Sequence, residues 1–185
     1  MQYKILDNDK FEKEKYNIVS LRYEDIYDIK KWRNQQMDIL RQKKKLTNKD
    51  QENYYKNQIL PTFDEKKPKQ ILFSFLYNNT CIWYWWLTNV HRDDKSAELS
   101  FLENTNRTKD KKMYEKDFSI FISFMKELVF QKLWFNRLFT ETYDIRPIHI
   151  KILEKNWFVY EWRMKKHVFV KWKYVDSLIH WCLFK

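Results

Sequence analysis

The chain of 185 residues contains no glycine and nine tryptophans. Average usage of about 7% predicts roughly 13 glycines in a chain of this length, and random sampling would leave none on the order of once in a million. Glycine adopts the left-handed backbone of tight turns and helix ends at no steric cost, so this chain has to place other residues there. The positions of the tryptophans therefore limit the possible folds more than any other feature.

Three of the tryptophans occupy positions that favour glycine. Trp157 follows "LEKN" just past a predicted helix end, where a left-handed residue is usual. Trp172 stands in the middle of a predicted hairpin turn, and Trp134 stands between a long helix and the next strand. We expect a positive φ at these positions. A further three tryptophans fall within the predicted strand "CIWYWWLTNV".

Length and composition predict one domain over residues 1–185, with residues 1–15 as a polar extension or a lead-in to the first strand. Charged residues make up 33% of the chain, and no apolar run approaches the roughly 18 residues of a membrane span. No targeting segment is visible, which favours a cytoplasmic location. Cys81 and Cys182 lie in apolar strands without a CxxC motif or a histidine cluster, so we expect reduced core thiols and no metal site.

The net charge of +11 favours anionic partners. Lysine and arginine are spread along the whole chain, however, and this pattern specifies no single ligand. Nucleic acid, a phosphorylated cofactor or acidic ribosomal surroundings would all suit it. An AT-rich coding sequence, which raises the lysine content, would explain it without any function.

Hydrophobic periodicity predicts the element order β-α-α-β-β-β-α-β-α-β-β. The strands are expected at 16–22, 70–77, 80–89, 95–103 and 136–143 and in a hairpin over 158–184, and the helices at 23–35, 47–60, 114–130 and 146–156.

Local signals set several of these boundaries. Thr47 or Asn48 can cap the second helix, and Pro61 is expected to end it. Asn78 and Asn79 tolerate the positive φ of a tight turn, so they are expected to join two strands. The third helix carries one apolar stripe, formed by Phe118, Phe121, Ile122, Met125 and Val129.

When glycine is read in place of tryptophan, the chain contains "CIGYGGLTNV", "KLGFNRLFTETY", "ILEKNGFVYEGRMKKHVFVKGKY" and "DSLIHGCLFK". In this form it resembles the GNAT acyltransferase superfamily over roughly residues 16–184, in the branch of ribosomal-protein N-terminal and amino-sugar acetyltransferases. The most specific piece is the helix end "ILEKN-x-F" followed by the basic strand "EWRMKKH". The resemblance implies a mixed α/β (α+β) fold, in which a mostly antiparallel sheet of about seven strands is flanked by about four helices.

This resemblance leads to a hypothesis about the tryptophans themselves. Some bacteria read UGA as glycine, and a translation that assigns UGA to tryptophan would produce this pattern at Trp83, Trp85, Trp86, Trp134, Trp157, Trp162, Trp172 and Trp181. Trp32 is excluded, because the family itself carries tryptophan there. The alternative is a chain that is truly rich in tryptophan. Overpacking costs about 1–3 kcal/mol or more per site, so eight such replacements would cost about 8–24 kcal/mol, enough to cancel the roughly 5–15 kcal/mol stability of a domain.

The resemblance implies acetyl-CoA as co-substrate. The strand that matches "AELSFLE" would hydrogen-bond the pantetheine arm through its backbone, and amides at the start of the next helix would hold the pyrophosphate. The usual phosphate motif of the family is not legible in "NRTKDKKMYEKD", where Arg107 alone matches, so a solvated basic loop is the alternative. The implied cofactor contacts are Ser100, Phe101, Leu102, Glu103, Arg107, Lys109, Lys111, Lys112 and Asn156.

Amine acetylation needs a group that removes a proton from the amine and a group that protonates the leaving thiolate. Glu98 matches the strand carboxylate that many family members place beside the amine. At the position where the family often has a tyrosine that protonates the thiolate, this chain has Leu153. Tyr143, Arg146 and His149 are left as substitutes, unless the thiolate leaves into water.

The resulting hypothesis is an acetyl-CoA-dependent N-acetyltransferase that needs no metal. The first choice of acceptor is an amino group on a nucleotide-linked sugar, because "IKKWRNQQMDILRQ" with "LT-x-x-DQ" is similar to the amino-sugar members. A protein N-terminus is the second choice, and a homodimer is possible. The contrasting hypothesis is a non-catalytic basic module that binds nucleic acid through its cations and exposed aromatics such as Tyr54 and Tyr55.

Overall fold

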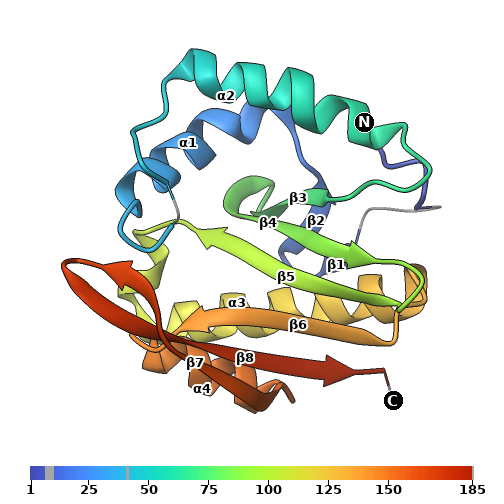
Figure 1. The fold of residues 1–185 in the computed structure, drawn as a ribbon. Helices are drawn as coiled ribbons and strands as arrows, with labels where there is room; N and C mark the ends of the chain where they lie inside the picture. The colour runs from blue at the N-terminus through green and yellow to red at the C-terminus, as the bar shows by residue number, and fades with distance from the viewer. Residues whose placement is uncertain (7–10, 41, 185) are drawn as a thin grey trace.

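The computed structural model describes residues 1–6, 11–40 and 42–184. They form one eight-stranded sheet in the order β1-β2-β3-β4-β5-β6-β8-β7, in which only the β5–β6 pair is parallel (Figure 1). The strands are β1 (Phe11–Lys13), β2 (Tyr16–Ser20), β3 (Ile71–Tyr77), β4 (Thr80–His91), β5 (Ser96–Glu103), β6 (Arg137–Tyr143), β7 (Val159–Val170) and β8 (Lys173–Leu183).

Four α-helices of the described chain flank the sheet, where about four were predicted. Helices α1 and α2 lie together on one side of it, and α3 and α4 lie on the other (Figure 1). Their bounds are α1 (Ile26–Gln35), α2 (Asn48–Tyr54), α3 (Lys111–Lys126) and α4 (Pro147–Lys155). The predicted fold class is confirmed, with eight strands instead of about seven. The additional strand is β1, which lies inside the segment 1–15 that was expected to be an extension or a lead-in.

Helix α2 begins where its capping residues predict. The Thr47 hydroxyl accepts from the Asp50 N–H at 3.1 Å, and the Asp50 carboxylate accepts from the Thr47 N–H at 2.8 Å. This reciprocal pair satisfies two amides of the first turn. The predicted end at Pro61 is wrong, because α2 passes into a π-turn over Tyr55–Ile59 and a 3₁₀ turn over Leu60–Phe63. Proline is tolerated in the first turn of a helical segment, and Pro61 occupies such a position.

The predicted left-handed positions are confirmed. The two turn residues Asn78 and Asn79 have φ values of 47° and 61°. Trp134, Trp157 and Trp172 have φ values of 57°, 66° and 65°, and their side chains are 73%, 72% and 90% exposed. A residue with a Cβ is disfavoured in this region. These three tryptophans therefore adopt a backbone conformation that favours glycine, and their exposed side chains bury too little surface to offset its cost.

The main core lies between the sheet and α3. Trp83 and Trp85 are fully buried there and pack on Phe121. The predicted apolar stripe, which runs from α3 into the π-helical turn Glu127–Lys132, is buried as a whole. Among the described residues, neither indole N–H finds a hydrogen-bond partner. Burying a donor without a partner costs free energy. Two of the tryptophans thus lie in the core with their polar atoms unsatisfied.

The two cysteines are free thiols in buried positions, as expected. Burial raises the pKa of Cys81 well above its ordinary value. Because the thiolate is the nucleophilic form, Cys81 is a poor nucleophile and serves to pack the core. None of the helices in the described part of the chain is long and apolar enough to cross a membrane.

Strands β5 and β6 separate along their length, and this opening positions the functional site. They pair over three residues, from Ser96 with Arg137 to Glu98 with Phe139. Beyond this point β5 stays paired with β4 as far as Glu103, and β6 stays paired with β8 as far as Tyr143. The inner edges of residues 99–103 and 140–143 therefore face each other without pairing.

Candidate active site

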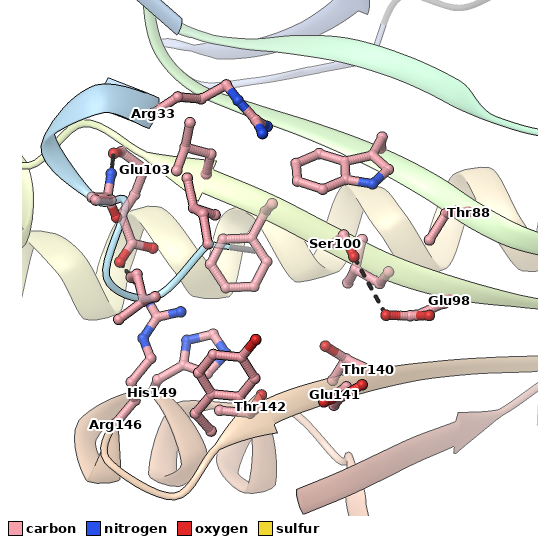
Figure 2. A pocket seen from close by; sticks show the side chains of 18 of the residues that line it. Arg33, Thr88, Glu98, Ser100, Glu103, Thr140, Glu141, Thr142, Arg146 and His149 are labelled. Carbon is pink, nitrogen blue, oxygen red and sulfur yellow. Dashed lines mark hydrogen bonds and ion pairs between the residues drawn. The ribbon is translucent and has the colours of Figure 1, made fainter. Parts of the chain in front are cut away.

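A pocket of about 480 Å³ lies where β5 and β6 separate (Figure 2). Residues 98–103 of β5 and residues 140–143 of β6 form two of its walls. Helix α1 with the segment that follows it contributes a third wall, and the start of α4 contributes a fourth. The pocket thus combines unpaired strand edges with side chains from both sides of the sheet.

Glu98 lies at the last β5–β6 pair, at the closed end of the opening. The Asn89 side-chain amide donates to its carboxylate at 2.6 Å, and the Ser100 hydroxyl lies 3.5 Å from it. Asn89 reaches Glu98 because the β4–β5 register shifts between Thr88 and His91, and Asn89 has a φ of 45° within that irregularity. A β-bulge re-aims side chains in this way. The predicted base is therefore inside the pocket and held by a neighbouring strand.

A polar network lies at the open end of the pocket. The Arg146 guanidinium forms an ion pair with Glu103 and also lies 3.5 Å from the Tyr114 hydroxyl. That hydroxyl lies 2.8 Å from Nδ1 of His149. Among the described residues, Oε2 of Glu103 and Nε2 of His149 are buried without a hydrogen-bond partner, and both residues line the pocket. Two buried hydrogen-bonding atoms at the open end are therefore unsatisfied within the described chain.

His149 is held in its neutral form. Burial lowers the pKa of His149 well below its ordinary value, and the nearby Arg146 and His180 lower it further. A neutral imidazole at neutral pH is a poor proton donor to a thiolate but a good hydrogen-bonding group. Tyr143 lines the same pocket from the end of β6. The structure thus gathers Glu98, Tyr143 and His149 in one pocket, and their catalytic roles stay predictions.

The predicted cofactor contacts on β5 all line the pocket. They are Ser100, Phe101, Leu102 and Glu103. Phe101 packs on the α3 side of the sheet, with ring centroids 5.1 Å from Phe118 and 4.9 Å from His149. Side chains alternate along a strand, so Ser100 and Leu102 lie on the opposite, α1 side. The pocket is therefore reached from both sides through the gap between the strands.

Arg107 lies outside the residues that line the pocket. Its guanidinium donates twice to the fully buried Asp117, at 2.7 and 3.0 Å, and the Tyr16 hydroxyl donates to the same carboxylate at 2.7 Å. The hydrogen bond to Asp117 raises the pKa of Arg107. These contacts fasten the loop that follows β5 to α3. The phosphate contact expected of Arg107 stays a prediction, and the contacts observed are structural.

The start of α3 carries its own anion. The Asp110 carboxylate accepts from the backbone N–H groups of Lys112 and Met113, at 2.9 and 3.1 Å. Pyrophosphate would have to share or displace this cap to use the same amides. Lys109, Lys111 and Lys112 lie beside it, outside the pocket lining. Their predicted phosphate contacts stay predictions.

Asn156 also lies outside the pocket lining. Its side-chain amide donates to Ser119 at 3.0 Å and to the Ile152 carbonyl at 2.8 Å, which joins the end of α4 to α3. Its role as a cofactor contact is untested and stays a prediction, while its contacts serve helix packing.

Sequence reasoning missed several pocket residues. Arg33 on α1, Trp86 on β4 and Thr140 and Glu141 on β6 all line the pocket. Arg33 follows the buried Trp32 of α1, and a single arginine in a short helix gives no signal of a ligand. The alternation of β6 predicts that Thr140 and Thr142 share a face, but only the separation of β5 from β6 exposes that strand to a ligand.

A family model for an acetyltransferase (GNAT) domain matches residues 18–179. The chain belongs to the GNAT acetyltransferase family. This membership confirms the resemblance and the predicted activity, which is the transfer of an acetyl group to an amine with acetyl-CoA as co-substrate. No curated protein matches this GNAT sequence.

Solved structures share the GNAT fold at low identity. The spermidine N-acetyltransferase from Vibrio cholerae, in complex with CoA and spermine, matches with a TM-score of 0.78 at 16% identity, covering 91% of this chain and 95% of that one. A chimera of the Vibrio cholerae enzyme and hSSAT has a TM-score of 0.77 at 15% identity, with 92% and 96% coverage. A dodecameric form of the Vibrio cholerae enzyme has a TM-score of 0.73 at 16% identity, with 91% and 94% coverage.

Among the described residues, the opening between β5 and β6 is suited to hold acetyl-CoA. Residues 99–103 present a strand edge without a pairing partner, and a pantetheine arm can add to such an edge through backbone hydrogen bonds. Within the same described ranges, no group of three or more histidine, cysteine, aspartate or glutamate side chains is placed to hold a metal ion.

Proposed function

We propose that this GNAT protein acetylates a primary amine, with Glu98 as the base that receives the amine proton. The observation that carries the proposal is the position of Glu98, which lies in the pocket at the point where β5 and β6 separate. An amine of pKa about 8 or above is mostly protonated at neutral pH, so a carboxylate has to accept its proton, directly or through water.

The other groups of the pocket support the same reaction. The strand edge of residues 99–103 would orient the acetyl donor, which supplies the acetyl group that becomes bonded to the amine nitrogen. One backbone N–H of that edge would donate to the thioester oxygen as negative charge develops there. Tyr143 is the pocket hydroxyl best suited to protonate the leaving thiolate, because His149 is held neutral.

The acceptor is proposed at the level of chemical class. An amino group on a nucleotide-linked sugar remains the first choice, and a protein N-terminus the second. The similar solved enzyme from Vibrio cholerae is in complex with CoA and spermine, so a polyamine is the third choice. A cytoplasmic location and a homodimer also stay proposals.

A thermal shift experiment tests the co-substrate against the contrasting class of protein. Acetyl-CoA is expected to raise the unfolding midpoint, because a ligand that binds only the folded state stabilises it. An oligonucleotide is expected to have no effect at 150 mM salt. The contrasting hypothesis of a nucleic-acid-binding module predicts a different result. The unfolding midpoint would not change with acetyl-CoA but would rise with oligonucleotide, and this rise would fall steeply as the salt concentration increases.

We also propose that glycine codons underlie eight of the tryptophans, all except Trp32. The left-handed backbone of Trp134, Trp157 and Trp172 and the unsatisfied indoles of Trp83 and Trp85 support this hypothesis. The nucleotide sequence is the test. UGA triplets are expected at the eight positions, together with a lower intact mass for the protein purified from its own organism. UGG triplets there would end the hypothesis.

A further inference from the structure

The pocket contains a cation that the proposed transfer steps do not use. Arg33 of α1 lines the pocket and is half-buried. Figure 2 shows it reaching toward the pocket from the side opposite Thr140 and Glu141. Within the part of the chain that the structure describes, no carboxylate forms an ion pair with Arg33. Its charge therefore faces the space in which an acceptor would bind.

The guanidinium is held in place by a chain of side chains. Nε of Arg33 donates to the Gln42 side chain at 3.2 Å, and Gln42 donates to the Asn34 side-chain oxygen at 2.9 Å. Asn34 in turn accepts from the backbone N–H of Leu46 at 2.8 Å and donates to its carbonyl at 2.9 Å. This arrangement uses Nε, and within the described ranges neither Nη group has a hydrogen-bond partner. A guanidinium oriented in this way is suited to bidentate binding of carboxylate or phosphate.

The remaining charges of the pocket are segregated. Arg146 and Glu103 pair with each other at the open end. Arg33 then stands on one side, and two carboxylates stand on the other. These are Glu98, which accepts from Asn89, and Glu141, which lies 3.2 Å from Nδ1 of His167. A molecule with an ammonium group at one end and an anionic group at the other matches this distribution, whereas a polyamine would place a second cation near Arg33. The net charge of +11 also attracts anions and repels polycations.

We infer that Arg33 binds an anionic group of the acceptor, so that this GNAT protein acetylates primary amines that carry a carboxylate or a phosphate and discriminates against polyamines. The inference rests on the proposed function, because it names the acceptor class for the same pocket. Arg33 is a specificity-determining residue that touches the acceptor at the end away from the reacting amine.

A panel of four amines tests this inference by the release of CoA thiol. Glucosamine 6-phosphate and glucosamine form a pair that differs in a phosphate, β-alanine carries a carboxylate, and spermidine carries only cations. We expect kcat/KM for glucosamine 6-phosphate to exceed that for glucosamine at least tenfold, and spermidine to be the poorest substrate. The ratio of β-alanine to glucosamine 6-phosphate then shows which anion Arg33 prefers.

Variants separate Arg33 from general electrostatics. R33Q is expected to remove the preference for glucosamine 6-phosphate over glucosamine, because its loss of kcat/KM for glucosamine 6-phosphate should exceed its loss for glucosamine at least tenfold. R33K keeps the charge but lacks the planar fork, so an intermediate preference is expected. K31Q removes a charge from an exposed position of the same helix, outside this pocket, and should leave the preference unchanged.

Several results would overturn the inference. A preference for spermidine, or a loss in R33Q that is equal for all four amines, would contradict it. If no amine of the panel is acetylated, binding is measured instead by the shift of the unfolding midpoint on adding glucosamine 6-phosphate. Equal shifts in the wild type and in R33Q would overturn the inference. The proposed function has its own test, because it is contradicted if acetyl-CoA fails to raise the unfolding midpoint.

Discussion

Replacing Glu98 with glutamine is expected to lower kcat/KM for acetyl transfer about 100-fold, because a general base contributes a factor of that order or more. The amide oxygen of the new side chain can still accept from Asn89, so the local geometry is preserved while the proton acceptor is lost. The measurement is the initial rate of thiol release, with acetyl-CoA saturating and the best amine of the panel varied.

The pH dependence distinguishes a lost base from a damaged pocket. As the pH rises toward the pKa of the amine, free amine forms without help from the protein, so the deficit of E98Q should shrink. The thermal shift by acetyl-CoA should not change. E161Q alters a carboxylate of β7 that is paired with Arg137 outside the pocket, and it should keep near wild-type activity. If E98Q stays within threefold of the wild type at pH 7, Glu98 is not the base.

The triple variant W134G/W157G/W172G is expected to be about 3–6 kcal/mol more stable than the printed sequence, because a left-handed residue with a Cβ costs about 1–2 kcal/mol per position. The three side chains are exposed, so their removal sacrifices little packing. The greater freedom of glycine in the unfolded chain reduces the gain and favours the lower end of this range. Urea unfolding at 25 °C measures the difference through the midpoint, provided that the slope is unchanged.

Trp162 supplies the matched control for this gain. It is 64% exposed but lies in strand β7, so glycine there brings no relief of backbone strain. Glycine within a strand destabilises by roughly 0.5–1 kcal/mol, and W162G is therefore expected to be less stable than its parent. If the triple variant proves no more stable than the parent, or if W162G gains as much per site, the account based on φ is wrong.

Local chemistry in the chain was sufficient for most of the fold. Asn78 and Asn79 predict their turn, Thr47 predicts the start of α2, and the apolar stripe of α3 predicts its buried face. The left-handed positions of the tryptophans follow from the same kind of signal, because a helix end or a two-residue turn sets φ within a few residues. Pro61 is the exception, since a change of helix type at that point depends on how the segment packs.

The candidate site depends on contacts between distant segments. The pocket exists because β5 and β6 part after the Glu98–Phe139 pair, and strand patterns carry no information about where a pairing stops. The phosphate contact of Arg107 stays a prediction, but its ion pair with the buried Asp117 could not be read from the basic loop, because only the fold brings that carboxylate within reach. Arg33 reads as a polar residue of an amphipathic helix and becomes a pocket wall once α1 packs beside β5. Residue type and spacing therefore determined most of the elements and the resemblance to the family. The three-dimensional packing of the chain decided which charges meet and which remain for a ligand.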